Sequence, residues 1–133
     1  MTDINIGAIT EALNDKMDRD ANNIESPKLP IFLVDVQYPT ADNNYTWYRK
    51  YSDGWVEQGG EESLSGTNSL TINLIIEFSD TNYNIQITKK GPNSGNNNAS
   101  WCYYNKTTNS FGYRQNDSSG QGCCWMASGK AAS

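Results

Sequence analysis

Side chains able to perform catalysis are scarce in this chain, which contains no histidine. Without imidazole the chain lacks the usual general base, every serine or cysteine triad that depends on it, and the commonest metal ligand. The cysteines are Cys102, Cys123 and Cys124, and a zinc site would need a fourth ligand and a Cys-x-x-Cys spacing that is absent. We therefore expect no metal, no cofactor and no catalytic residue.

Carboxylates provide the one remaining catalytic option, because a pair of them can hydrolyse a glycosidic bond. Asp53, Glu57, Glu61 and Glu62 are close in sequence, but acids on the surface near a turn explain this more simply. No Gly-x-x-x-x-Gly-Lys phosphate loop occurs. The sequence thus argues against an enzyme.

The cysteines leave two interpretations open. Three thiols cannot all pair within one chain, and the vicinal Cys123 and Cys124 would strain the peptide between them if bonded to each other. Either all three are reduced and partly buried, or Cys102 bridges one of the vicinal pair.

Aromatic and amide side chains suit the binding of a sugar. Rings stack on the apolar C–H faces of the sugar, and amides and carboxylates bond to its hydroxyls. Rings border polar loops in the last third of the chain, although half or more of them could instead belong to the core. We expect the contact loops to be 93–100 and 115–121. The candidate ligand-binding residues are Asn96, Asn97, Asn98, Trp101, Tyr104, Tyr113, Asn116 and Asp117.

The clearest element that could position such groups is a β-hairpin over residues 47–60, WYRKYSDGWVEQGG. Its aromatic-rich runs flank Asp53-Gly54, a pair preferred in type I′ turns because both central positions need positive φ. This turn predicts a register that pairs Tyr51 with Val56, Lys50 with Glu57 and Arg49 with Gln58, and a face shared by Trp47, Tyr51 and Val56.

Alternating apolar residues predict further strands. Residues 31–38 are expected to form a half-buried strand, and residues 83–88 to pair with 70–78 so that eight apolar side chains line one sheet face. Residues 101–104 and 111–113 predict a second hairpin, and 123–127 a final strand. About seven or eight short strands favour an all-β antiparallel sandwich. In the strand at 70–78 the inward side chains are expected to be Leu70, Ile72, Leu74, Ile76 and Phe78.

Residues 5–24 have the spacing of an amphipathic helix. A single apolar stripe, with no neighbouring helix to cover it, is typical of a short coiled coil, although the helix could fold back on its own domain. Pro27 and Pro30 would end it. We expect residues 1–26 to form an oligomerisation or attachment segment and 27–133 a sandwich head. The residues expected to oligomerise are Ile6, Ile9, Leu13, Met17 and Ile24.

Charge and hydropathy exclude two classes of partner. The chain of 133 residues has a net charge of −5 and no extended basic cluster, so nucleic acid is not an expected ligand. No apolar run approaches the roughly 20 residues that span a bilayer, and the start lacks the pattern of a signal peptide. We expect no membrane insertion, and synthesis in a bacterial cytoplasm.

Several motifs together carry a family resemblance: Trp47-Tyr48-Arg49, Ser52-Asp53-Gly54-Trp55, Gln58-Gly59-Gly60, Asp80-Thr81-Asn82-Tyr83 and Asn105-Lys106-Thr107-Thr108. Between about Trp47 and Ala131 the chain resembles the C-terminal head domain of bacteriophage tail fibres and related prophage proteins. The vicinal cysteines in the last strand depart from the pattern, which has Trp-Tyr-Ala or Trp-Gln-Ala there.

The resemblance implies a small β-sandwich, a homotrimer, at the tip of a fibre that contacts the host surface. The expected function is a receptor-binding tip on the virion, made in the host bacterial cytoplasm, that recognises a host cell-surface polysaccharide or glycan. The N-terminus would attach another tail or baseplate protein. Two alternatives remain: a baseplate or fibre-capping protein with no ligand of its own, and a depolymerising enzyme, which the missing histidine disfavours.

Overall fold

The computed structural model describes residues 29–64, 67–91, 100–116 and 121–133. From Ile31 to Ser133 the chain forms one compact unit. Its elements are β1 (Leu33–Gln37), the short 3-10 helix η1 (Ala41–Asn43), β2 (Trp47–Tyr51), β3 (Trp55–Glu62), β4 (Ser69–Asn73), β5 (Asn84–Lys89), β6 (Trp101–Tyr104), β7 (Ser110–Gln115) and β8 (Cys123–Lys130).

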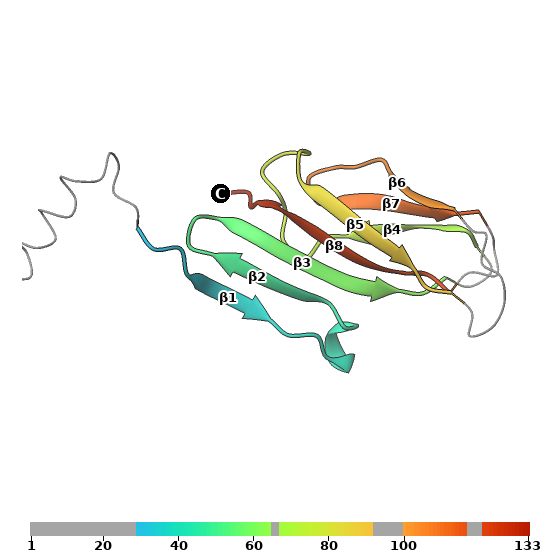
Figure 1. The fold of residues 1–133 in the computed structure, drawn as a ribbon, viewed down its shortest axis with the longest axis horizontal. Coiled ribbons are helices and arrows are strands. Elements are labelled where there is room, and N and C mark those ends of the chain that lie inside the picture. The colour runs from blue at the N-terminus through green and yellow to red at the C-terminus, as the bar shows by residue number, and fades with distance from the viewer. Residues whose placement is uncertain (1–28, 65–66, 92–99, 117–120) are drawn as a thin grey trace, which may run out of the picture. The chain divides into compact units, whose positions relative to one another are not determined.

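The strands form two antiparallel sheets (Figure 1). Sheet A has five strands in the order β1-β2-β3-β8-β5, and sheet B has three in the order β4-β7-β6. The all-β antiparallel prediction is confirmed. The hairpin predicted over 101–113 is present as β6 and β7, and the predicted final strand is β8.

The core lies between sheet B and the β3-β8-β5 part of sheet A. Side chains that are paired across strands must share a face, and Gln58 pairs with Ala127 while Ile87 pairs with Trp125. The buried apolar residues are Val56, Leu64, Ile72, Phe78, Tyr83, Phe111, Tyr113, Cys123, Trp125 and Ala127.

The first hairpin exists, but its predicted register is wrong by one residue. Lys50 pairs with Val56, and Arg49 with Glu57. The loop has three residues, because Gly54 N donates to Tyr51 O at 2.9 Å and Gly54 has a φ of 87°. This is the pattern of a type I turn that a left-handed glycine completes, whereas a type I′ turn would also require positive φ at Asp53. Val56 therefore points into the core, away from the face of Trp47.

The apolar set from Leu70 to Phe78 faces the core as expected, but the predicted pairing of this segment with 83–88 is wrong. Strand β4 ends at Asn73 and pairs with β7, whereas β5 pairs with β8 in the other sheet. The chain crosses between the sheets, and Phe78 already bridges Ala131 beside sheet A. The predicted row of eight side chains is thus divided between two facing sheets.

The buried Gln58 side chain holds this crossing segment. Its Oε1 accepts hydrogen bonds from Ile75 N at 2.8 Å and Ile76 N at 3.0 Å, and its Nε2 donates to Ile76 O at 2.7 Å. One side chain from sheet A thereby makes hydrogen bonds to the backbone groups just after β4, where the chain is no longer a strand.

Strands β1 and β2 extend sheet A beyond the core. No residue of either strand is buried, so the prediction of a half-buried strand at 31–38 is wrong for this chain taken by itself. In Figure 1 the two strands lie on the side of β3 that faces away from β8. We call β1 and β2 the ribbon.

The helix predicted over 5–24, and with it Ile6, Ile9, Leu13, Met17 and Ile24, lies outside the described residues. The division at residue 26 stays a prediction. Within the described ranges, no helix is long and apolar enough to cross a membrane.

Candidate functional site

Those predicted sugar-binding residues that the structure describes do not form one surface. Asn96, Asn97, Asn98 and Asp117 lie outside the described residues. Trp101 and Asn116 are exposed, Tyr104 is half-buried, and Tyr113 is completely buried.

Tyr113 is a core residue, which contradicts its prediction as a ligand contact. Its hydroxyl donates to Gln115 Oε1 at 2.9 Å inside the sandwich. Tyr104 lies on the opposite face of sheet B, over Gly112, and its ring is 4.7 Å from the Arg114 guanidinium. Trp101 belongs to a different surface, which is described in the next paragraph. A ligand that contacts Trp101 there would therefore not also contact Tyr104.

Trp101 belongs to an apolar groove between the edge strands β5 and β6. We call this groove the seam; its volume is about 300 Å³ and it is lined by Ile85, Ile87, Trp101, Cys102 and Tyr103. The Trp101 indole N–H donates to Ile87 O at 3.1 Å, which links the edges of the two sheets. At its rim, Lys106 Nζ is 5.8 Å from the centre of the Tyr103 ring.

A second hollow has the composition that a sugar requires. It has a volume of about 540 Å³, within the range of ligand pockets, and lies where the loop between η1 and β2 meets the end of β3. We call it the Tyr45 hollow; it is lined by Asn43, Asn44, Tyr45, Thr46, Glu61, Glu62 and Ser63.

The loop that presents the Tyr45 ring has an unusual backbone. Asn44 and Tyr45 have φ values of 57° and 58°, a left-handed conformation that costs an L-residue roughly 1–2 kcal/mol. Tyr45 N donates to Thr40 O at 2.8 Å, and Thr46 N donates to Asn43 O at 3.2 Å. These bonds fix the loop, and the Tyr45 ring is left 56% exposed at the hollow. Strain held in this way is typical of functional positions.

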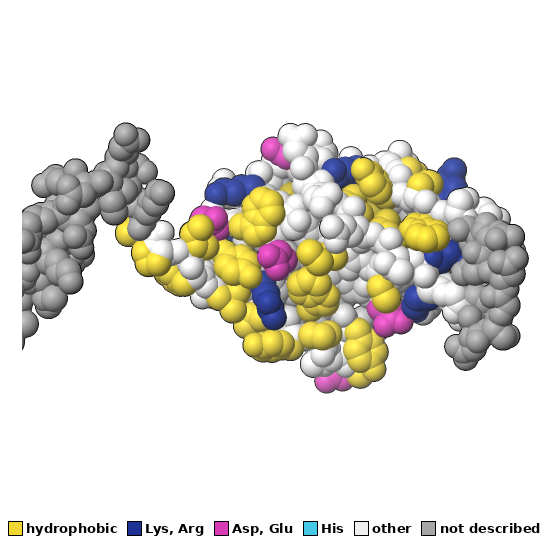
Figure 2. Space-filling view, in the orientation of Figure 1, with side chains coloured by type: hydrophobic (Ala, Val, Ile, Leu, Met, Phe, Trp, Pro, Cys, Tyr) yellow, Lys and Arg dark blue, Asp and Glu magenta, His cyan; other side chains and the backbone are white. Residues whose placement is uncertain are grey.

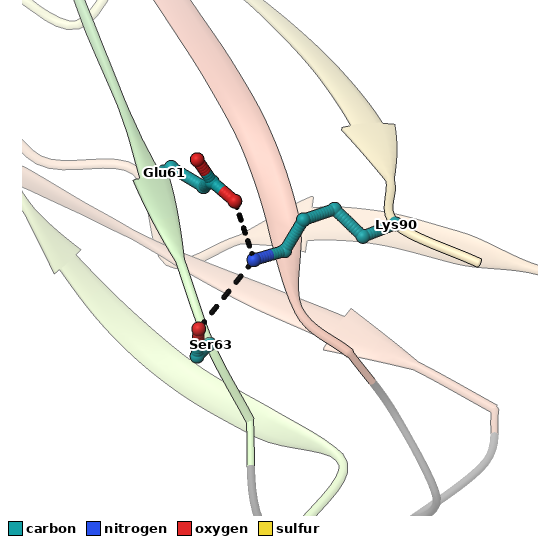
Figure 3. A network of polar contacts seen from close by, with 3 residues as sticks. All are labelled: Glu61, Ser63 and Lys90. Carbon is teal, nitrogen blue, oxygen red and sulfur yellow. Dashed lines mark hydrogen bonds and ion pairs between the residues drawn. The ribbon is translucent and has the colours of Figure 1, made fainter. Parts of the chain in front are cut away.

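The opposite wall of the hollow is also fixed. Lys90 Nζ donates to Glu61 Oε1 at 2.8 Å and to Ser63 Oγ at 3.4 Å (Figure 3). Burial raises the pKa of the neighbouring Glu62, and the Lys90 ammonium partly opposes this rise. The wall thus presents oxygen acceptors in fixed positions and carries a net negative charge.

The Tyr45 hollow was not predicted from the sequence, because the longest polar loops lie elsewhere in the chain. A signal for it is visible in the sequence around residue 45, where the aromatic side chain lies between Asn43-Asn44 and Thr46 in a short loop before a strand. The acids in its wall were noted only as possible hydrolytic residues. Asp53 is at the far end of β3 from Glu61, so these acids do not form one cluster.

The described part of the chain contains no group of three acidic, cysteine or histidine side chains placed to hold a metal ion. All three cysteines are thiols, so the bridge between Cys102 and the vicinal pair is not formed in this structure. Cys102 and Cys124 are exposed, whereas burial raises the pKa of Cys123 to about 12.

We compared the chain and its fold with known proteins. No protein-family model and no curated protein matches the chain. Two solved structures do match. The C-terminal part of the R2 pyocin fibre of P. aeruginosa has a TM-score of 0.58 and 17% identity, over 83% of this chain and 28% of the fibre chain. An N-truncated R2-type pyocin tail fibre has a TM-score of 0.62 and 15% identity, over 98% of this chain and 53% of that one.

The chain shares its fold with part of the R2 pyocin tail fibre structures. The resemblance to a tail-fibre C-terminal domain, which the sequence motifs suggested, is thus confirmed at the level of the fold. The chain spans about a quarter of the length of one R2 pyocin fibre structure and about half of the other.

Proposed function

We propose that this protein is the receptor-binding tip of a phage tail fibre, or of a fibre on a related phage-tail-like particle. It assembles as a homotrimer and binds a glycan on the host cell surface. The fold likeness to pyocin tail fibres supports the tail-fibre part of the proposal. Its N-terminal segment attaches to another tail or baseplate protein. Synthesis takes place in the host cytoplasm before the particle assembles.

The Tyr45 hollow is the observation that carries the glycan proposal. An exposed ring faces amides, a hydroxyl and carboxylates across a pocket of about 540 Å³. A sugar would stack one C–H face on Tyr45 and bond through its hydroxyls to Asn43 and Glu61. Because Glu61 and Glu62 repel anions, the preferred glycan is uncharged or carries amino groups. Three hollows in a trimer would multiply a weak single-site affinity.

A glycan array with the full chain tests the proposal. We expect binding to neutral or amino-sugar glycans, and a loss of about fivefold or more in affinity for Tyr45→Ala, since stacking on a ring is worth roughly 1 kcal/mol or more. Trp55→Ala is the matched control, because Trp55 is an exposed aromatic residue at the opposite end of β3. Equal losses for both variants would contradict the Tyr45 hollow as the binding site. No binding by the unaltered chain would contradict glycan recognition and favour the capping role. Digestion of a polysaccharide would instead indicate an enzyme.

A further inference from the structure

Six of the exposed large apolar residues among those described lie at two sheet edges. Figure 2 shows hydrophobic side chains over the ribbon and the adjoining end of sheet A. Ile31, Phe32, Leu33 and Val34 are 63%, 59%, 45% and 51% exposed. We call these four residues the β1 edge. At the other side of the sandwich, Trp101 and Tyr103 in the seam are 45% and 48% exposed.

The β1 edge has the character of an unpaired interface. Strand β1 is the last strand of sheet A, so one side of its backbone has no ladder partner among the described residues. Soluble proteins usually protect such an edge with charges or prolines, and here four consecutive apolar residues occupy it. It is also held rigidly, because Phe32 N donates to Ser52 Oγ at 3.0 Å and Ser52 N donates to Phe32 O at 2.8 Å.

We infer that the β1 edge of one copy of this chain docks into the seam of the next copy. The inference rests on the proposed homotrimer and names the surfaces that form it. A contact between two different patches is head-to-tail, and three such contacts close a ring. Each copy then buries both of its apolar edges, and no copy is left with an open one.

Area and charge favour this pairing. At roughly 100 Å² for each half-exposed large side chain, the β1 edge offers about 400 Å² of apolar surface, which is within the range of about 300–600 Å² for the largest patch on a monomer, a patch that is often functional. With an equal area on the seam and the polar rims, each contact reaches the ~1,000 Å² that a specific interface needs. The charged residue of β1 is Asp35, and the seam carries Lys106 at its rim.

The two surfaces cannot meet within one chain. Strands β1 and β5 are separated by three strands in sheet A, and at about 4.8 Å for each of four spacings they are roughly 19 Å apart. A disulfide needs Cα atoms within about 7 Å. Any direct bond between residue 34 and Cys102 must therefore join two copies.

Cysteine cross-linking in the full chain tests the inference, because Cys102 already lines the seam. One variant combines Val34→Cys with Cys102→Ser and Cys124→Ser; a second, with a different tag, carries only Cys124→Ser. We expect co-expressed chains to form a disulfide between the two variants under mild oxidation, and neither variant to cross-link when expressed alone. The control replaces Val34→Cys with Thr71→Cys, an exposed position on β4, and should give no product.

The other outcomes separate the inference from its premise. A disulfide between two copies of the Val34→Cys variant would overturn the pairing in favour of a symmetric contact between β1 edges. A trimeric mass by light scattering together with no cross-link would also overturn this pairing, while leaving the proposed trimer intact. A monomeric mass for the unaltered chain would overturn both. Val34→Asp gives a second readout, since it should lower the mass of the assembly if the β1 edge is buried there.

Discussion

The Gln58 side chain pairs both the N–H and the carbonyl of Ile76, at 3.0 and 2.7 Å. This amide makes the backbone hydrogen bonds that a neighbouring strand would otherwise make, at the point where the chain leaves sheet B and crosses to sheet A. Since Gln58 is completely buried, no water substitutes for it. The sandwich is closed at this corner by a polar contact as well as by apolar packing.

Replacing Gln58 should therefore cost far more than a typical loss of one side chain. Gln58→Leu would leave the partly buried groups Ile75 N, Ile76 N and Ile76 O without this partner, at about 1–3 kcal/mol for each group. We expect a loss of at least about 3 kcal/mol in the free energy of unfolding by urea. Gln86→Leu, on the exposed face of β5, should stay within about 0.5 kcal/mol. Equal effects would show that the contact does not support the fold.

This corner also explains which part of the fold the sequence could predict. Alternation identified the core side chains from Leu70 to Phe78 correctly, because each points inward whichever sheet it belongs to. It could not reveal the change of sheet, since periodicity describes faces and not partners. The signal lies in a distant polar residue, Gln58, whose burial depends on the whole fold.

The first hairpin shows a similar limit. Asp53-Gly54 correctly predicted a turn, because glycine at this point supplies positive φ. Two-residue and three-residue loops both use such a glycine, so composition alone did not decide between them. The one-residue difference places Val56 in the core, on the face opposite to Trp47 and Tyr51, with which it was predicted to share a face.

Two glycines with positive φ should respond differently to alanine. At Gly122, with φ of 92°, an added Cβ would lie 1.9 Å from Glu62 O. At Gly54, with φ of 87°, its three nearest neighbours would be atoms of the flexible Lys130 side chain, the first at 3.2 Å. We expect Gly122→Ala to cost about 3 kcal/mol or more from backbone strain and the clash, and Gly54→Ala about 1–2 kcal/mol from strain alone. Thermal unfolding of both variants measures the difference, and a reversed order would contradict the packing around Gly122.

The fold should lose stability in alkali. The Tyr83 hydroxyl donates to Thr107 O at 2.8 Å and Ser110 O at 3.2 Å, and burial raises its pKa from 10.0 to about 12. Burial likewise raises the pKa of Cys123 from 9.0 to about 12. Both groups are held neutral in the folded state, so their stabilisation is complete below pH 9 and is lost as the pH rises toward 12.

Urea unfolding across this pH range measures the effect. Tyr83→Phe should be less stable at neutral pH, since two carbonyls lose their donor, but its stability should fall less steeply between about pH 10 and 12 because one titrating group is gone. An unchanged slope would mean that Tyr83 does not titrate with folding.

The candidate site was less predictable than the fold. Composition directed attention to the long loops at 93–100 and 115–121, which are rich in amides. The Tyr45 hollow instead joins a short loop to the end of β3, which is more than a dozen residues away along the chain. The pairing of β2 with β3, in which Trp47 lies opposite Gly59, brings these two segments together, and that register was itself predicted wrongly by one residue.

Substitutions of Tyr45 test whether the strained backbone of this loop serves glycan binding. Its φ of 58° is unfavourable for alanine and acceptable for glycine, and its 56% exposed ring contributes little packing. We therefore expect Tyr45→Gly to be more stable than Tyr45→Ala by about 1 kcal/mol, the reverse of the usual order, while both variants lose glycan binding. Chemical unfolding beside a glycan-binding assay separates the two effects. If alanine proved the more stable, the loop would not hold this conformation; if glycine retained binding, the ring would not be the contact.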